Sequence, residues 1–304
     1  MKTQITDLLD KSLVGISQAQ KERLAYIEFR LYFLGEFSRQ DLSARFGMAP
    51  AGATRDIAQY KRLFPENIGF DSASKRYTLG KNFQAMFEHV PERVLSVLSH
   101  GFGDGVATNT GALVNCEFPM TFNSPVMSVL APVTRAIHQK SVVGMRYYSH
   151  TSGQSTREIV PFALVNDGLR WHVRAFDRKS QEFRDFVLTR MENAVAIEGA
   201  HVEKHERPAE DNEWNRVVEL KLVPHPDRKQ KAIIERDYGM TDGLRRIKVR
   251  AAIAGYLLLH WIVDCSADHR LKGEEYRLWL MDDLALYGVS SAKFAPGYSP
   301  PRAK

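Results

Sequence analysis

The stretch Ser38–Phe64, SRQDLSARFGMAPAGATRDIAQYKRLF, contains two short helical patterns separated by a tight turn. Ser38 followed by Asp41 is typical of a helix start, because both side chains can satisfy free N–H groups of the first turn. We expect this helix to end at Gly47. Pro50 suits the first turn of the next helix, because its missing N–H would have no partner there. The stretch therefore predicts a helix-turn-helix.

The segments on either side complete this unit. Before it, an apolar stripe at helical spacing predicts a helix that ends at Gly35 and contains Leu24, Ile27, Leu31 and Leu34. After it, residues 67–70 and 75–79 predict a β-hairpin with the turn Asp71–Ser74, and Lys75 and Arg76 lie near its tip. A helix-turn-helix followed by such a hairpin is a winged helix, which we place in residues 1–95.

The helix over residues 51–64 has an apolar face and a basic face. Ile57 and Tyr60 fall on the face that packs inward, whereas Arg55 falls on the opposite face. Small residues at its start would let the helix sit deep in a DNA groove, and an arginine fork can bind guanine or phosphate. The residues expected to contact DNA are Arg39, Ala51, Thr54, Arg55, Gln59, Lys61, Arg62, Lys75 and Arg76. The alternative is a three-helix bundle whose basic residues are only solvated.

The overall charge favours a polyanionic partner. The 304 residues contain 42 Lys+Arg and 36 Asp+Glu, which gives a net charge of +6 and a pI near 9.2. The excess lies at both ends, because residues 1–95 and 211–304 each carry +3 whereas residues 96–210 are neutral. With 44% hydrophobic and 26% charged residues, the composition is that of a globular protein of two or three domains and excludes fibrous and wholly disordered classes.

Other classes of protein find little support in the sequence. Cys116 and Cys265 lie in no CxxC motif or Cys/His cluster, so we expect no metal and no cofactor. There is no GxxxxGK[ST], HExxH or GxSxG motif and no clustered carboxylates, so we assign no catalytic residue and expect no enzyme. The N-terminus lacks a secretory pattern and the apolar stretch 251–263 is too short to span a bilayer, so we expect a cytoplasmic protein with no membrane partner.

The middle of the chain alternates between short patterned runs and turns. A short helix is expected at 131–140. Four runs that predict strands follow, at 141–148, 155–165, 169–176 and 183–188. The turn Asn166-Asp167-Gly168 is a strong hairpin signal. Several short strands at this spacing predict a compact β-barrel.

Polar residues gather along these strands. His172 and Arg174 share one face of their strand, whereas Trp171 and Val173 share the other. If the first face points toward the same mouth as Tyr147, the result is a cationic pocket with an aromatic wall, which suits a phosphate-bearing or nucleotide-like ligand. The candidate ligand-binding residues are Tyr147, Ser149, His150, Arg157, Trp171, His172, Arg174 and Arg190. Structural alternatives remain open: Trp171 in the core, the histidines in ordinary hydrogen bonds, and Arg190 paired with Asp185 or Glu192.

At these residues the sequence resembles the WYL domain of bacterial transcription regulators. The similarity is carried by Met145–His150, by Arg157-Glu-Ile-Val-Pro161, by Trp171–Phe176 and by Phe183–Arg190, with the eponymous tripeptide present as Trp171-His172-Val173. The resemblance implies an Sm/SH3-like barrel that binds nucleotide or nucleic-acid ligands. It implies a pocket formed by Tyr147, Ser149, His150, Arg157, His172, Arg174 and Arg190.

The last block predicts a small α+β module. His225-Pro226-Asp227 opens a helix over 226–238, a basic strand follows at 244–250, and a helix at 251–263 and a strand at 275–280 complete the pattern. The order of winged helix, WYL barrel and C-terminal extension resembles the homodimeric repressors found beside phage-defence operons of the BREX and CBASS type. The segments Phe46–Ile57, Ala254–Trp261 and Val263–Ser266 carry this closer similarity.

The sequence therefore predicts an α+β multidomain protein. The boundaries are residues 1–95 for the winged helix-turn-helix, 96–125 for a linker, 126–200 for the WYL domain, 201–212 for a second linker, 213–290 for the C-terminal extension and 291–304 for a flexible tail. We expect a homodimeric, sequence-specific regulator that binds double-stranded DNA at an inverted repeat, represses a phage-defence operon and responds to a nucleotide or oligonucleotide effector. A nucleic-acid-processing enzyme and an RNA-binding module acting through the barrel are the alternatives.

Overall fold

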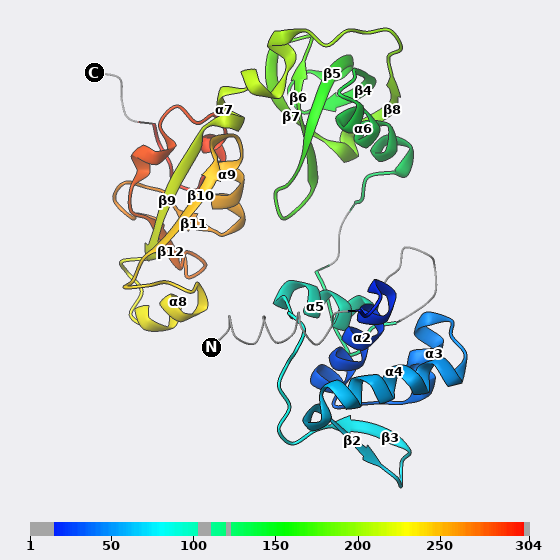
Figure 1. The fold of residues 1–304 in the computed structure, drawn as a ribbon. Coiled ribbons are helices and arrows are strands. Elements are labelled where there is room, and N and C mark those ends of the chain that lie inside the picture. Colours follow the sequence, from blue (N-terminus) through cyan, green and yellow to red (C-terminus); the bar gives the residue numbers. More distant parts are fainter. Residues whose placement is uncertain (1–14, 103–110, 120–122, 301–304) are drawn as a thin grey trace. The chain divides into compact units, whose positions relative to one another are not determined.

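The computed structural model describes residues 15–102, 111–119 and 123–300, and the chain divides into two units, residues 1–118 and 119–304. The first unit contains the predicted winged helix. The second contains a central module built on a five-stranded sheet and a C-terminal module built on a four-stranded sheet (Figure 1). The predicted order of three α+β parts is confirmed.

The winged helix follows the sequence prediction closely. Its three helices are α2 (Gln18–Leu34), α3 (Arg39–Phe46) and α4 (Pro50–Leu63). Its three short strands are β1 (Glu36–Phe37), β2 (Ile68–Asp71) and β3 (Arg76–Leu79). The strands form an antiparallel sheet in the order β1-β3-β2, and the β2–β3 hairpin extends beyond the helices as the wing (Figure 1). Helix α5 (Pro91–His100) follows and crosses the expected boundary at residue 95.

The local signals of the helix-turn-helix act as the sequence predicted. Ser38 and Asp41 form a complete capping box at the start of α3. Gly35 and Gly47 end α2 and α3 with φ angles of 79° and 60°, a left-handed backbone that glycine adopts without a steric cost. Pro50 is the first residue of α4. The turn between the two helices is therefore specified locally.

A buried glutamate, which the sequence analysis did not identify, joins the parts of this unit. Glu28 of α2 is fully buried and accepts hydrogen bonds from the N–H groups of Met86 (2.9 Å) and Phe87 (2.8 Å). It also accepts one from the Tyr60 hydroxyl of α4 (3.1 Å) and lies 3.1 Å from His89 Nε2. Burial raises the pKa of Glu28 even though these hydrogen bonds act in the opposite direction. One carboxyl group thus connects α2, α4 and the segment after the wing.

In the central module, one helix packs on an antiparallel sheet whose strands differ in length. Its elements are α6 (Met127–Gln139), β4 (Val143–Ser149), β5 (Gly153–Asn166), β6 (Trp171–Asp177), β7 (Glu182–Val187) and β8 (Met191–Ala196). The strand order is β7-β6-β5-β4-β8, and α6 packs on β8 and β5. The predicted closed barrel is not formed, because β7 and β8 remain edge strands. The sequence analysis also missed β8 and began α6 four residues too late.

The C-terminal module contains a helix on a small sheet. Its elements are α7 (Asn212–Asn215), β9 (Val217–Pro224), α8 (Lys231–Asp237), β10 (Arg245–Arg250), α9 (Ala251–His260), β11 (Val263–Asp264) and β12 (Leu278–Leu280). The order is β10-β9-β12-β11, antiparallel except for the parallel pair β11–β12. Strand β9, which was not predicted, is the second strand of the sheet, and helix α8 is five residues shorter at its start than expected.

Two segments expected to be loose are packed. Residues Ser290–Phe294 form a 3₁₀ helix whose Ser291 and Ala292 are buried against α9, so the prediction of a flexible tail from residue 291 is wrong for this part. Gly255 permits the contact, because a Cβ there would lie 1.8 Å from the Ser291 carbonyl oxygen. The expected linker 201–212 is likewise fixed to the central sheet, since buried Glu206 pairs with Arg178 at 2.6 Å.

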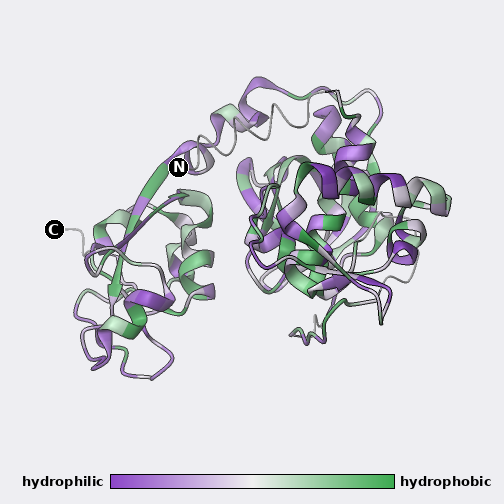
Figure 2. Ribbon diagram, turned by 60° about the horizontal axis from the view of Figure 1, so that its bottom comes forward, coloured by the Kyte–Doolittle hydropathy of each residue, from purple (hydrophilic) through white to green (hydrophobic). Residues whose placement is uncertain are grey.

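The elements are amphipathic rather than uniformly apolar. Figure 2 shows hydrophobic and hydrophilic stretches interleaved along the helices and strands. Within the described ranges, no helix combines the length and the apolar character needed to cross a membrane.

Candidate functional site

Helix α4 buries one face and presents the opposite face to solvent, as predicted. Ile57 and Tyr60 are buried, whereas Arg55 is exposed. Asp56, also buried, accepts hydrogen bonds from Arg23 Nε (2.5 Å) and Gln20 Nε2 (2.9 Å) of α2. This ion pair fixes the rotation of α4 about its axis and thereby determines which side chains point outward.

The nine candidate DNA-contacting residues differ in solvent exposure and in whether another side chain already binds them. Exposed positions on or beside α4 and at the wing tip are Arg39, Ala51, Thr54, Arg55, Lys61, Arg62 and Lys75. Arg39 lies 3.5 Å from the Thr54 hydroxyl, and Arg62 is hydrogen-bonded to Gln59, which is half-buried. For Arg55 and Lys61, no partner is found within the part of the chain that the structure describes. Both cations are available to an external anion.

The two basic residues predicted at the wing tip, Lys75 and Arg76, have different environments. Lys75 lies at the turn with a left-handed φ angle of 56°, and it is exposed. Arg76 instead pairs with Glu36 at 2.8 Å and lies 3.7 Å from Asp41, which ties the wing to the start of α3. In this conformation the charge of Arg76 is already compensated.

The second unit contains a cavity of about 750 Å³ between the central sheet and the C-terminal module. The alternation of β6 explains its floor, because His172 and Arg174 point away from the core in which Val173 is buried. The register with β7 sets Asp185 opposite Arg174 on this same face. Of the candidate ligand residues, the cavity brings together Tyr147, Ser149, His150, His172, Arg174 and Arg190.

The other wall of the cavity comes from the C-terminal module, which the sequence analysis did not include. Tyr256 of α9 stacks on Phe294, with ring centroids 4.9 Å apart, and lies 5.3 Å from the His172 ring. Leu259 of α9 and Lys293 also line the cavity. An aromatic wall is present, but it is built by residues of the C-terminal module, which lie far along the chain from the strand that forms the floor.

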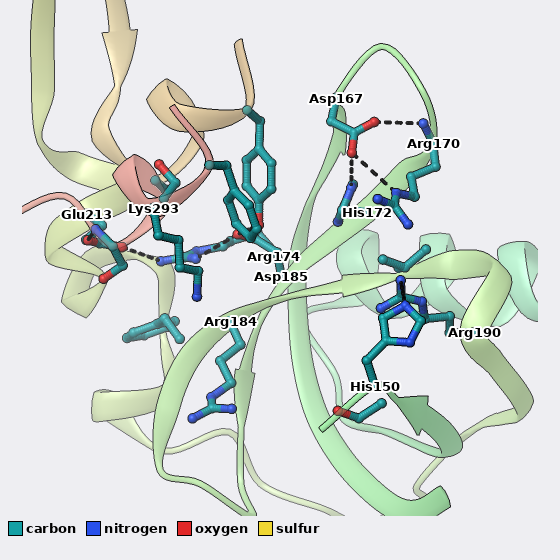
Figure 3. A pocket seen from close by; sticks show the side chains of 18 of the residues that line it. His150, Asp167, Arg170, His172, Arg174, Arg184, Asp185, Arg190, Glu213 and Lys293 are labelled. Atoms are coloured by element: carbon teal, nitrogen blue, oxygen red, sulfur yellow. Dashed lines mark hydrogen bonds and ion pairs between the residues drawn. The ribbon is translucent and has the colours of Figure 1, made fainter. Parts of the chain in front are cut away.

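Arg174 is already saturated by carboxylates. Its side chain is 5% exposed and donates to Asp211 at 2.8 and 3.1 Å. It also donates to Asp185 at 3.2 Å and lies 3.7 Å from Glu213 (Figure 3). Asp211 in turn caps α7 by accepting from the N–H groups of Glu213 and Trp214. The predicted cationic floor is therefore electrically compensated, and Arg174 joins β6 to the start of the C-terminal module.

Asp167 organises a second group on the cavity wall. Its carboxylate accepts from His172 Nε2 at 2.7 Å and lies 3.5 Å from Arg170 Nε (Figure 3). Burial opposes the ionisation of Asp167, but the hydrogen bonds from His172 and from two backbone N–H groups outweigh it and hold its pKa below the usual value. The predicted hairpin turn Asn166–Gly168 thus positions a histidine of the pocket.

Positive charge that remains accessible lies at the edge of the cavity. Arg190 donates to His150 Nε2 at 2.7 Å, Arg184 forms a half-exposed pair with Glu182, and Lys293 is exposed beside the Phe294 ring. We call Arg184, Arg190 and Lys293 the basic rim. An anion bound here would meet cations whose partners are neutral or solvated.

Two candidate ligand residues are not brought into the cavity. Arg157 is held by Asp177 at 2.7 Å, and it does not line the cavity. Trp171 is also absent from the lining and is 43% exposed, so neither the wall nor the core position expected for it is correct. It shares the core face of β6 with Val173, but it lies at the strand end, beyond the residues that cover the core.

The described residues contain no group of three or more His, Cys, Asp or Glu arranged to hold a metal ion. The buried set His225, Asp264 and Ser266 resembles a catalytic arrangement only superficially. Ser266 donates to Asp264 at 2.6 Å rather than to His225, so the histidine cannot take its proton as a general base.

Family models match the three parts of the chain in the observed order. They are described as the BrxR transcriptional regulator winged helix-turn-helix domain (residues 19–100), the WYL domain (residues 128–196) and the BrxR transcriptional regulator C-terminal dimerization domain (residues 217–286). Their boundaries agree with the elements described above.

Similar proteins match along most of the chain. The DNA-binding transcriptional repressor CapW of Escherichia coli strain KTE188 is 31% identical over 92% of this chain and 94% of its own length. The protein of the same name from Pseudomonas aeruginosa is 30% identical over 82% and 84%. The solved structure of proteasome accessory factor B/C of Arthrobacter aurescens covers 87% of this chain and 45% of its own at 19% identity, with a TM-score of 0.27 that carries no argument. Together, the family models and the curated relatives show that the chain belongs to the BrxR/CapW family of WYL-domain transcriptional regulators.

Proposed function

We propose that this protein is a homodimeric, sequence-specific DNA-binding repressor of a phage-defence operon, controlled by a nucleotide-like or nucleic-acid ligand in the WYL cavity. The observation that carries the proposal is the exposed face of α4. Within the described residues, Arg55 and Lys61 have no partner there, and Asp56 fixes the rotation of the helix. A helix of this kind in a winged helix lies in the major groove, and an arginine on it can read guanine.

The C-terminal module supports the dimer. Residues 217–286 match a model described as a dimerization domain, and a two-fold protein suits an operator with two-fold symmetry. The relatives named as DNA-binding transcriptional repressors support repression rather than activation. Two copies of α4 would then contact two half-sites of an inverted repeat.

The test is fluorescence anisotropy with labelled duplexes from the DNA upstream of the protein's own gene. We expect Arg55→Ala to weaken binding to the selected duplex by about 1–3 kcal/mol, roughly 5- to 150-fold, because it removes one base or phosphate contact. Arg93→Ala is the matched control, since it removes an exposed arginine from α5 rather than from α4. That variant should bind within about twofold of the unchanged protein.

Single-stranded RNA of the same sequence separates the RNA-binding alternative. If RNA binds at least as tightly as the duplex and Arg55→Ala leaves both affinities unchanged, the winged helix is not the reader and the proposal fails. If a nucleotide effector acts through the cavity, it must shift operator affinity by binding the two states of the dimer unequally, typically by about 1–3 kcal/mol.

A further inference from the structure

The floor of the cavity contains two buried polar atoms without a partner. His172 Nδ1 and Asp185 Oδ1 are both inaccessible to solvent and form no hydrogen bond within the described part of the chain. His172 is 4% exposed and the Asp185 side chain 9%, and both line the cavity. An unsatisfied buried polar atom carries a desolvation cost, which a bound ligand can remove by supplying the missing hydrogen bond.

The neighbouring contacts determine the chemistry of both atoms. A carboxylate can only accept, so His172 Nε2 must donate its hydrogen to Asp167, and Nδ1 of the neutral ring is left as an acceptor. Asp185 Oδ2 already accepts from Arg174 and from the Tyr256 hydroxyl at 3.3 Å, which leaves Oδ1 as a second acceptor. The floor therefore presents two acceptors and no free donor.

The two acceptors lie on one face of neighbouring strands. His172 and Arg174 alternate on β6, and Asp185 stands opposite Arg174 on β7, so His172 and Asp185 are diagonal neighbours. A phosphate cannot satisfy this floor, because its oxygens only accept. The ligand group that binds here must carry adjacent N–H donors.

The remaining surface of the cavity adds two requirements. The partly exposed Phe294 ring, stacked on Tyr256, offers an aromatic surface on which a planar base can lie. The basic rim of Arg184, Arg190 and Lys293 offers charge to a phosphate. Among the common nucleobases, guanine is the one whose pairing edge has two adjacent donors, N1–H and the 2-amino group.

On the basis of the proposed ligand control, we propose that the cavity recognises a guanine nucleotide, either free or within a single strand. The guanine edge donates to Asp185 Oδ1 and His172 Nδ1, the base stacks on Phe294, and the phosphate binds at the basic rim. Because the floor comes from the central module and the aromatic wall from the C-terminal module, the ligand contacts both modules at once.

The test is isothermal titration calorimetry of the full-length protein without DNA. The probes are GMP, IMP, which lacks the 2-amino group, and AMP. Two short single-stranded DNA oligonucleotides, one with a single guanine and one with inosine in its place, distinguish a free nucleotide from a strand. In whichever series binds, nucleotides or oligonucleotides, we expect the guanine ligand to bind at least about tenfold more tightly than the inosine ligand, since inosine loses one hydrogen bond to a charged group. GMP should likewise bind at least about tenfold more tightly than AMP.

Variants separate base recognition from phosphate binding. Asp185→Asn should reduce the guanine-to-inosine ratio to near one, whereas Lys293→Ala should weaken both ligands equally and keep the ratio. Trp171→Ala, on strand β6 beside His172 but outside the cavity, should change neither. The guanine-to-inosine affinity ratio of the unchanged protein is measured without any variant. It therefore tests the proposal even if Asp185→Asn does not fold.

The result that overturns the proposal is equal affinity of the unchanged protein for guanine and inosine ligands, or no binding of any probe at millimolar concentration. A ratio that survives in folded Asp185→Asn also overturns it. Operator binding by the same preparations is measured in parallel. Intact operator binding without nucleotide binding rejects only the guanine site, whereas loss of operator binding by the unchanged protein rejects the proposed function itself.

Discussion

Replacing Arg174 by methionine is the sharpest test of how the second unit is held together. The change keeps an unbranched apolar stem and removes the guanidinium that pairs with Asp211 at 2.8 Å and with Asp185 at 3.2 Å. Both acids are nearly buried, so they cannot be rehydrated without moving the structure. Removing one partner of a buried ion pair costs about 3–5 kcal/mol, because an uncompensated charge remains.

This magnitude should be easy to measure. In a unit of this size, about 1 kcal/mol corresponds to roughly 2–4 °C in the melting temperature, so Arg174→Met should lower it by about 6–20 °C. Tryptophan fluorescence follows the second unit alone, because all four tryptophans lie in residues 119–304: Trp171, Trp214, Trp261 and Trp279. Urea unfolding monitored in this way gives the change in the free energy of unfolding.

The control is Arg184→Met, which removes an arginine of the same cavity whose pair with Glu182 is half exposed. Exposed pairs contribute about 0–1 kcal/mol, so this variant should melt close to the unchanged protein. If Arg174→Met is no less stable than Arg184→Met, the carboxylates around Arg174 do not depend on it. In that case the description of Arg174 as a structural clamp is wrong.

Three further results are expected. Lys75→Ala should weaken binding to every duplex alike and reduce the slope of log K against log salt by about 0.9, the value for one phosphate contact; an unchanged slope in salt titrations would place the wing tip away from DNA. Glu28→Gln should abolish a pH effect on the stability of the first unit. The pKa of Glu28 is raised in the fold, so the native state binds more protons and stability falls as pH rises through that pKa. Circular dichroism melts at several pH values should show this fall in the unchanged protein only. Gly255→Ala should destabilise the second unit by about 1–3 kcal/mol in urea unfolding, because the new Cβ would overlap the Ser291 carbonyl; a neutral result would mean that the 3₁₀ helix moves away freely.

The winged helix could be predicted because its signals are local. Ser38, Gly47 and Pro50 each act within one turn of their own position, and the structure contains the cap, the left-handed stop and the helix start that they indicate. The periodicity of α2 and the hairpin turn are equally short-range. A sequence pattern of this kind needs no knowledge of the tertiary contacts.

Strand β9 carried a usable signal that was overlooked. In Val217–Pro224 the buried positions alternate with more exposed ones, and Val218, Leu220 and Leu222 form the apolar face. This is the ordinary period of a half-buried strand. A charged segment before it and the helix signal of His225-Pro226 after it flank this short alternation, so it stands between two stronger local patterns.

The complete cavity could not be predicted, because its parts are distant in sequence. His172 and Arg174 were identified from the β6 alternation, but Tyr256 and Phe294 reach the same space only through the packing of the C-terminal module. Charge compensation was equally hidden, since Asp211 is 37 residues from Arg174. Buried Glu28 illustrates the same limit, because three of its four partners lie 58 to 61 residues further along the chain.

The most direct test of the central claim is a footprint of the purified protein on the DNA upstream of its own gene at low salt. We predict two protected half-sites related by two-fold symmetry, with centres one helical turn or a whole multiple apart, and we predict that Arg55→Ala needs roughly 5- to 150-fold more protein to protect both. A protected region without two-fold symmetry, or a symmetric footprint that Arg55→Ala forms at the same protein concentration, would contradict this assignment.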